Sequence, residues 1–215
     1  MRCRFSFVLG LFTAACQRAP AEDFTPRVNA PIAPVAAPQA KAPVESPTHL
    51  RAQGGRCIAE MPLQAPPAAK PLPATACPAD PERAPPARPF VTVMFGDAAP
   101  KASVQAELVR SPHDTARGLM YRTSMAEDRG MLFDLGTRED HKFWMHNTCI
   151  PLDLLYLDDD GLIVGIVENA PTLDDEPRGV ACPSSYVLEV NAGWARRHGV
   201  RAGQLVTLPP ELTAK

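Results

Sequence analysis

The stretch FWMHNTCIPLDLLYLDDDGLIVGIV, residues 143–167, decides the fold class of this chain. Three runs rich in apolar, aromatic and β-branched residues, at 143–148, 152–157 and 162–167, have the length and composition of β-strands. The DDDG sequence at 158–161 separates the last two runs, and Asp and Gly tolerate the backbone angles of a hairpin turn. We therefore predict antiparallel strands joined by a tight, solvated turn.

Shorter patterns extend this prediction in both directions. A helix is expected at 111–120, because Ser111 suits a helix cap and Pro112 the first turn. A second helix is expected at 192–198, capped by Asn191. Further strands are expected at 90–95, 102–110, 130–135, 186–190 and 204–208. The fold class is therefore α+β, mainly antiparallel β: a small β-barrel-like domain with two short helices, spanning residues 90–210, before a tail at 211–215.

The N-terminus has the pattern of a secretion signal. A basic start at 1–4 precedes an apolar run at 5–12, which is shorter than the roughly 20 residues that span a bilayer. Cys16 follows Thr13-Ala-Ala and resembles a bacterial lipobox cysteine, although Leu is usual where Thr13 stands. We expect residues 1–16 to direct export and Cys16 to carry a lipid that holds the protein on a membrane of the cell envelope. Ordinary cleavage without lipid is the alternative.

Residues 17–89 are predicted to form a disordered, Pro/Ala-rich tether. Of the 25 prolines, 17 lie between residues 17 and 90, and proline removes a backbone donor and fixes φ. Runs such as PIAPVAAP at 31–38 favour extended spacers. Folding is therefore expected only in about the last 125 residues.

The cysteines agree with export to an oxidising compartment. Once Cys3 is removed with the signal and Cys16 carries a lipid, four of the six remain and can form two disulfides. Their order along the chain suggests Cys57–Cys77 and Cys149–Cys182, and the other connectivities stay open.

Charge argues against a nucleic-acid partner. Residues 91–215 contain 12 Lys and Arg and 18 Asp and Glu, a net charge of −6. Nucleic-acid binding requires clustered positive charge.

Six motifs, in order, resemble one prokaryotic family. They are ARGLMYR (116–122), GMLF (130–133), FWMHNT (143–148), IPLD (150–153), VLE (187–189) and NAGW (191–194). The chain is similar to the uncharacterised family known as domain of unknown function 192, over roughly residues 91–209. The resemblance implies a compact β-rich domain, often exported, with no assigned reaction. The usual Trp-Met-Lys-Asn is Trp-Met-His-Asn here, which removes a fixed positive charge at His146.

Polar groups beside an aromatic residue, with Arg forking onto an anion, are typical of a small-molecule site. The candidate ligand-binding residues are Arg117, Arg122, Trp144, His146, Asn147 and Asp153. The alternative for each is structural, for example an internal pair between Arg117 and Asp153.

We expect a non-catalytic binding module for a small polar or anionic ligand or for another envelope protein, without a cofactor. A hydrolase or transferase acting on cell-envelope or sugar substrates, with Asp153 and His146 as acid and base, is one alternative. Copper handling through Met120, Met131, Met145 and His146 is another, although the methionines fit core packing better. A nucleophilic Cys149 is disfavoured because a disulfide is its simpler fate.

Overall fold

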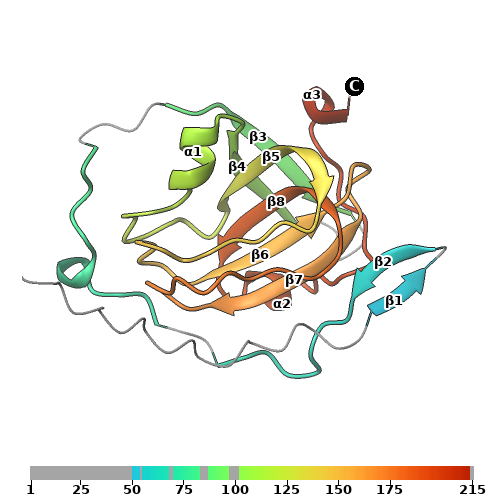
Figure 1. Cartoon of the computed structure of the whole chain (residues 1–215), viewed down its shortest axis with the longest axis horizontal. Coiled ribbons are helices and arrows are strands. Elements are labelled where there is room, and N and C mark those ends of the chain that lie inside the picture. The colour runs from blue at the N-terminus through green and yellow to red at the C-terminus, as the bar shows by residue number, and fades with distance from the viewer. Residues whose placement is uncertain (1–49, 54, 68–69, 83–86, 97–101, 214–215) are drawn as a thin grey trace, which may run out of the picture. The chain divides into compact units, whose positions relative to one another are not determined.

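The computed structural model describes residues 50–53, 55–67, 70–82, 87–96 and 102–213 (Figure 1). The expected signal at 1–16, with Cys16, and the first part of the expected tether lie outside the described residues. All described residues belong to one unit, Val44–Lys215. In these ranges no helix is both long and apolar enough to span a membrane.

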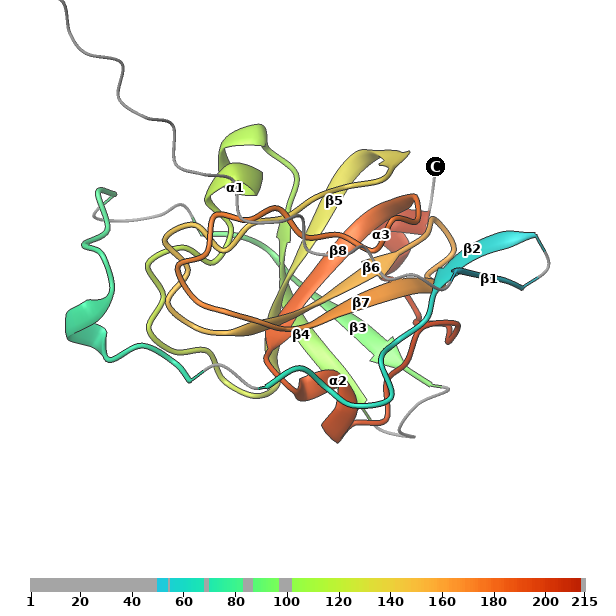
Figure 2. The same ribbon diagram turned by 60° about the horizontal axis from the view of Figure 1, so that its bottom comes forward.

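The core of the fold is one six-stranded sheet with the strand order β3-β4-β5-β8-β6-β7 (Figures 1 and 2). Its strands are β3 (Phe90–Phe95), β4 (Ala102–Val109), β5 (Arg129–Glu139), β6 (Leu152–Leu157), β7 (Ile163–Ala170) and β8 (Ser184–Asn191). Every neighbouring pair is antiparallel except β4 and β5, which are parallel. The predicted class, mainly antiparallel β with short helices, is confirmed.

The sheet is not closed, so the domain is barrel-like at most. The strand predicted at 204–208 is wrong as a strand, because this segment forms only isolated bridges. Thr207 pairs with Met94 of β3, and Leu205 pairs with Leu162 just before β7. The backbone of residues 204–207 thus reaches both outer strands without forming a continuous ladder with either.

The central strands are buried on both faces, which explains their nearly continuous apolar sequence. All six residues of β6 are buried. In β8, Leu188 packs into a cluster with Phe95 and Trp194, while its neighbour Val187 packs into a second cluster with Phe133. Alternate side chains along β8 therefore serve two cores.

Three short α-helices flank the sheet: α1 (Pro112–Arg117), α2 (Trp194–Arg197) and α3 (Pro210–Thr213). The first has the expected cap, because the Ser111 side chain accepts a hydrogen bond from the Asp114 N–H. The second begins after Gly193 rather than Asn191, whose side chain instead donates to the carbonyls of Met125 and Ala126. The third helix was not predicted. It begins at Pro210, which is the last residue of the expected domain.

The predicted strand at 143–148 is also wrong. Phe143 forms one bridge with Arg178, and the chain then turns, with Asn147 in the left-handed region at φ 51°. A left-handed residue ends an extended segment, so the polar HNT sequence at 146–148 forms a loop. The apolar residues before this turn therefore form one bridge, at Phe143, and no strand.

The hairpin between β6 and β7 forms where residues 158–161 predict it. The turn is not simply solvated, however. Asp158 is buried and accepts bonds from Arg138 Nε at 2.6 Å and Arg56 Nη2 at 2.6 Å. These hydrogen bonds outweigh the effect of burial and hold the pKa of Asp158 far below its usual range.

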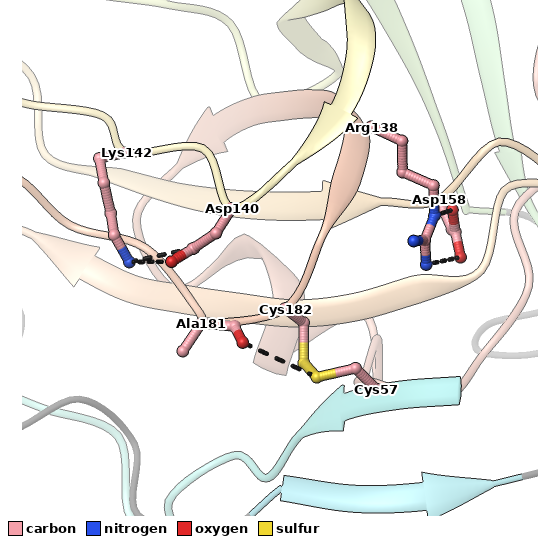
Figure 3. The surroundings of a disulfide bond; sticks show 7 residues. All are labelled: Cys57, Arg138, Asp140, Lys142, Asp158, Ala181 and Cys182. Atoms are coloured by element: carbon pink, nitrogen blue, oxygen red, sulfur yellow. Dashed lines mark hydrogen bonds and ion pairs between the residues drawn. A yellow bond between two sulfur atoms is a disulfide. The ribbon is translucent and has the colours of Figure 1, made fainter. Parts of the chain in front are cut away.

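The cysteines pair differently from the chain-order suggestion, which is wrong. One disulfide joins Cys57 to Cys182 (Figure 3), and the other joins Cys77 to Cys149. Two of these cysteines lie in the expected tether, and each is bonded to the domain rather than to the other. The physical reason is that β2 (Arg56–Ala59), paired with β1 (Leu50–Gln53), lies beside β7, which places Cys57 next to Cys182.

Contacts of the described residues 55–82 therefore extend the folded part beyond the boundary expected at residue 90. Ile58 and Ala59 are buried in the second apolar cluster. Arg196 donates to the carbonyls of Pro62 and Leu63, and Asn169 donates to that of Pro66. We call residues 55–82 the strap. In Figure 1 it is the cyan-to-green trace that includes the 3₁₀ helix η1 (Ala74–Ala76).

Candidate functional site

Two loops carry five of the six residues predicted to bind a ligand. The first, residues 117–122, begins at the last residue of α1, and the second, residues 144–149, precedes β6. We call them the loop pair. The sixth predicted residue, Asp153, lies in β6.

The two arginines of the first loop are held by carboxylates of the chain itself. Arg117 is 9% exposed, and its Nη2 donates to Asp80 Oδ2 of the strap at 2.5 Å, while Nη1 lies 3.5 Å from Glu82 Oε2. Arg122 forks onto Glu107 of β4, with Nη–Oε distances of 2.5 and 2.7 Å. Each guanidinium does bind a carboxylate, as its chemistry predicts, but the carboxylate is internal. The suggested pair of Arg117 with Asp153 does not form.

Tyr121 and Asn147 join the two loops. The Tyr121 N–H donates to the Asn147 carbonyl at 2.8 Å, and Asn147 Nδ2 donates to the Tyr121 hydroxyl at 3.0 Å. Both residues have positive φ, 66° and 51°, which is uncommon for residues other than glycine and is a true outlier for a bulky one. Such conformations persist only where the surrounding structure enforces them, and they are concentrated in functional sites.

An exposed aromatic pair lies on the second loop. The Trp144 ring is 49% exposed and stacks on the His146 ring with 5.1 Å between centroids. The imidazole Nδ1 of His146 lies 2.7 Å from Asp175 Oδ1, which fixes the ring orientation. This part of the site therefore offers a flat apolar surface next to polar groups.

Asp153 has a structural environment. It is fully buried, and its carboxylate accepts hydrogen bonds from the backbone N–H groups of Asn169, Gly193 and Ala195 at 2.9–3.0 Å. Burial raises the pKa of Asp153, and the three N–H bonds oppose this shift. Since His146 bonds Asp175 instead, the structure does not bring the suggested acid and base together.

Sequence reasoning missed the most unusual ionisable group, Glu189 of β8. It is 4% exposed, and its Oε2 has no hydrogen-bond partner among the described residues. Burial raises the pKa of Glu189 to about 8, although the positive charge of Arg122 acts in the opposite direction. The carboxyl is therefore mainly protonated at neutral pH. A signal was present, because Glu189 is the sole charged residue of the apolar run at 186–190.

Glu189 lies next to the first loop. A Cβ built on Gly118 would meet Glu189 Oε2 at 4.0 Å and Phe133 Cζ at 3.4 Å, which are ordinary contact distances. Gly118 has φ 48° and ψ −132°, a conformation open essentially to glycine alone. The backbone of the first loop at Gly118 thus lies beside the buried acid and the Phe133 ring.

The sulfur-containing residues serve the core and the disulfides. Met131 and Met145 are fully buried in the second apolar cluster, as core packing predicts. Cys149 is bonded to Cys77, so it offers no thiolate. Within the described part of the chain, no group of three or more His, Cys, Asp and Glu side chains is arranged to hold a metal ion.

Comparisons with known proteins agree on the domain. The family model DUF192, described as "Uncharacterized ACR", matches residues 94–208. A solved structure from Sinorhizobium meliloti 1021, whose description proposes a transcription regulator, is 36% identical, with a TM-score of 0.54; the match covers 58% of this chain and 97% of that one. A protein of unknown function from Novosphingobium aromaticivorans DSM 12444 is 34% identical, also with a TM-score of 0.54, and 59% and 94% are covered. No curated protein matches the chain.

Proposed function

This chain belongs to the domain of unknown function 192 family, and we propose that it is a non-catalytic binding module of the cell envelope, with the loop pair as its site. The ligand we propose is a small polar molecule. The observation that carries the proposal is the buried Glu189 carboxyl beside Gly118 of the first loop, whose Oε2 has no hydrogen-bond partner among the described residues.

A buried polar atom without a partner costs roughly 1–3 kcal/mol of stability. In folded proteins such atoms are few, and each one requires an explanation, of which a role in binding is one. Glu189 lies beside Gly118, and Gly118 belongs to the same loop as Tyr121, whose left-handed conformation is enforced by its bonds to Asn147. A ligand hydroxyl or amide could pair with the protonated carboxyl, which has both a donor and an acceptor.

The second loop supplies the other half of a binding site. Trp144 offers an exposed ring, and the Asp175–His146 pair places polar atoms beside it. An exposed aromatic surface with convergent polar groups is typical of sites for small molecules. The hydrogen bonds between Tyr121 and Asn147 connect this surface to the loop over Glu189, which supports one site rather than two.

The ligand can be sought by NMR titration of the domain with a panel of monosaccharides, amino acids and dicarboxylates. We expect one chemical class to shift the backbone amides of residues 117–122 and 144–149. Trp144→Ala should weaken that response at least tenfold, whereas the matched change of another exposed apolar residue, Leu63→Ala, should not. A panel that shifts nothing, or shifts amides elsewhere, would contradict the proposal.

We also propose that the protein is exported and tethered through a lipid on Cys16. The two disulfides support an oxidising location, because such bonds are rare in the cytosol. The test is fractionation of cells that express the wild type or Cys16→Ser. The wild type should sediment with membranes, and the variant should appear in the soluble envelope fraction. Equal distribution of the two proteins would rule out the lipid anchor.

An enzyme is the second candidate, and Glu189 is the observation that favours it. A carboxyl whose pKa is raised toward neutrality is suited to general-acid catalysis, as in enzymes that cleave glycosidic bonds. This role would belong to Glu189 rather than to Asp153 and His146. Incubation with cell-wall glycans distinguishes the candidates: turnover that Glu189→Gln abolishes would favour the enzyme, and binding without turnover would favour the module.

A further inference from the structure

The last part of the strap contacts both loops of the candidate site. Cys77 is bonded to Cys149 at the end of the second loop, and Asp80 pairs with Arg117 at the start of the first. Two residues after Asp80, the Glu82 N–H donates a hydrogen bond to the Asp80 side chain at 2.9 Å, which fixes a local turn. We call residues 77–82 the latch.

The two arginines of the first loop differ in where their carboxylates come from. Glu107, which holds Arg122, lies in the sheet strand β4 and cannot leave unless the sheet opens. Asp80 and Glu82, which hold Arg117, lie on the latch, outside the residues that the family model matches. The side chains of Asp80 and Glu82 are about one-third exposed. These two carboxylates can therefore separate from Arg117 without disturbing the core of the domain.

Arg117 itself is well placed to bind another anion. Its guanidinium is buried to 9% exposure and lies over the Tyr121 ring, 5.2 Å from the centroid. A planar, permanently charged fork fixed against an aromatic ring is preorganised for a carboxylate. The ion pair with Asp80 shows that a carboxylate oxygen fits there at 2.5 Å.

Building on the proposed binding function, we propose that Arg117 is a carboxylate-binding site that the latch occupies while Cys77–Cys149 is closed. Opening of that disulfide by a dithiol reductant uncovers the site. The ligand class at Arg117 is a small carboxylate, and the latch carboxylates are its internal competitor. The loop pair thereby responds to the redox state of its surroundings.

The redox step is a thiol–disulfide exchange. A reductant thiolate attacks the Cys77 sulfur, because Cys77 is partly exposed whereas Cys149 is fully buried. The Cys77–Cys149 bond breaks, and Cys149 leaves as a thiolate and takes up a proton. The second thiol of the reductant, as a thiolate, then attacks the reductant sulfur that is bonded to Cys77. Cys77 leaves and takes up a proton to become a thiol. Two electrons and two protons pass from the dithiol, which ends as a disulfide.

The test compares four forms of the processed protein by calorimetry with succinate as the probe. Cys77→Ser/Cys149→Ala opens the latch, and the matched control Cys57→Ser/Cys182→Ala opens the other disulfide, whose cysteines lie outside both loops and outside the latch. Asp80→Asn/Glu82→Gln keeps both disulfides but removes the internal carboxylates. We expect the latch-open and carboxylate-free variants to bind succinate at least tenfold more tightly than the wild type and the control.

Arg117→Gln, added to the carboxylate-free variant, should return succinate affinity to the wild-type level. If near-UV circular dichroism shows that Arg117→Gln does not fold, Arg117→Lys replaces it, since Lys keeps the charge but loses the planar fork. Hydrogen exchange at residues 116–122 should be faster in the latch-open variant than in the control. Equal succinate affinity in all four forms, or no effect of changing Arg117, would overturn the proposal.

The outcomes also separate this proposal from the binding function. If a panel ligand shifts the loop pair of the wild type while succinate binds all four forms equally, the latch is overturned and the binding module remains intact. If neither succinate nor any panel compound reaches the loop pair in any form, the latch and the binding function both fail.

Discussion

At the scale of single residues, two buried carboxylates of similar sequence context behave in opposite ways. Asp153 accepts three backbone N–H bonds, so its burial is compensated. Glu189 is buried without a partner for Oε2, so its burial is not compensated. Asp153 therefore stabilises the fold, whereas Glu189 lowers the stability of the protein.

Replacing Glu189 by Gln should stabilise the protein in a pH-dependent way. The pKa of Glu189 in the folded state, about 8, lies above the ordinary value of 4.5, so the folded protein retains a proton that the unfolded chain releases. This group therefore lowers the free energy of unfolding as pH rises from 4.5 to 8, by roughly 4 kcal/mol. Urea denaturation of both proteins at pH 4.5, 6 and 8 should give a difference that grows with pH. A constant difference would show that Glu189 does not titrate in this way.

Asp153→Ala should unfold or severely destabilise the domain. The change leaves three buried N–H groups without an acceptor, at a cost of about 3 kcal/mol or more. Asp175→Ala is the matched control, because Asp175 is an exposed carboxylate that pairs with the ring of His146 at the surface. Its melting temperature should stay within a few degrees of the wild type. Similar melting temperatures for both variants would contradict a structural role for Asp153.

At the scale of elements, local pattern was sufficient for strands with continuous apolar sequence and for the cap of α1. It was insufficient where long-range contacts decide the outcome. Residues 143–148 have a strand-like composition, but the bonds between Asn147 and Tyr121 require a turn. The disulfide pairing depends on β2 lying beside β7, and no feature of the sequence near Cys57 indicates that neighbour. In the candidate site, five of the six suggested residues do lie on two neighbouring loops, but residues 143–148 were expected to form a strand, and the internal partners of Arg117 and Arg122 could not be predicted.

The disulfide pairing can be checked by non-reducing peptide mapping. Cleavage after glutamate at Glu60 separates Cys57 from Cys77, and cleavage at Glu168 separates Cys149 from Cys182. Mass spectrometry should then find peptides that join Cys57 to Cys182 and Cys77 to Cys149. Linked peptides that contain Cys57 with Cys77 would instead support the pairing suggested by chain order.

At the scale of the whole molecule, the strap changes where the folded part begins. It adds two disulfides and two buried residues, Ile58 and Ala59, to a domain whose family-matched part begins at residue 94. Each disulfide is expected to stabilise such a domain by about 2–4 kcal/mol. The strap is thus part of the stability of this protein as well as a part of its candidate site.

Two truncations test this boundary. A chain beginning at residue 50 should keep both disulfides and the melting temperature of the processed protein. A chain beginning at residue 90 loses both disulfides and uncovers the surface under Ile58, so its free energy of unfolding should fall by several kcal/mol. Calorimetric melting of the two proteins provides the measurement. Equal stability would place the boundary at residue 90 after all.

The short segment at 204–207 has a consequence for solubility. Its bridges to Met94 and Leu162 occupy backbone groups at both edges of the open sheet, beside β3 and β7. An uncovered edge is a template for pairing with a strand from another molecule, which leads to aggregation. A nonsense mutation just before Gln204 would keep the sequence of all six strands, but it would free both edges and remove the buried side chains of Val206, Leu208 and Leu212. Such a shortened protein should aggregate rather than remain monomeric, which size-exclusion chromatography would show.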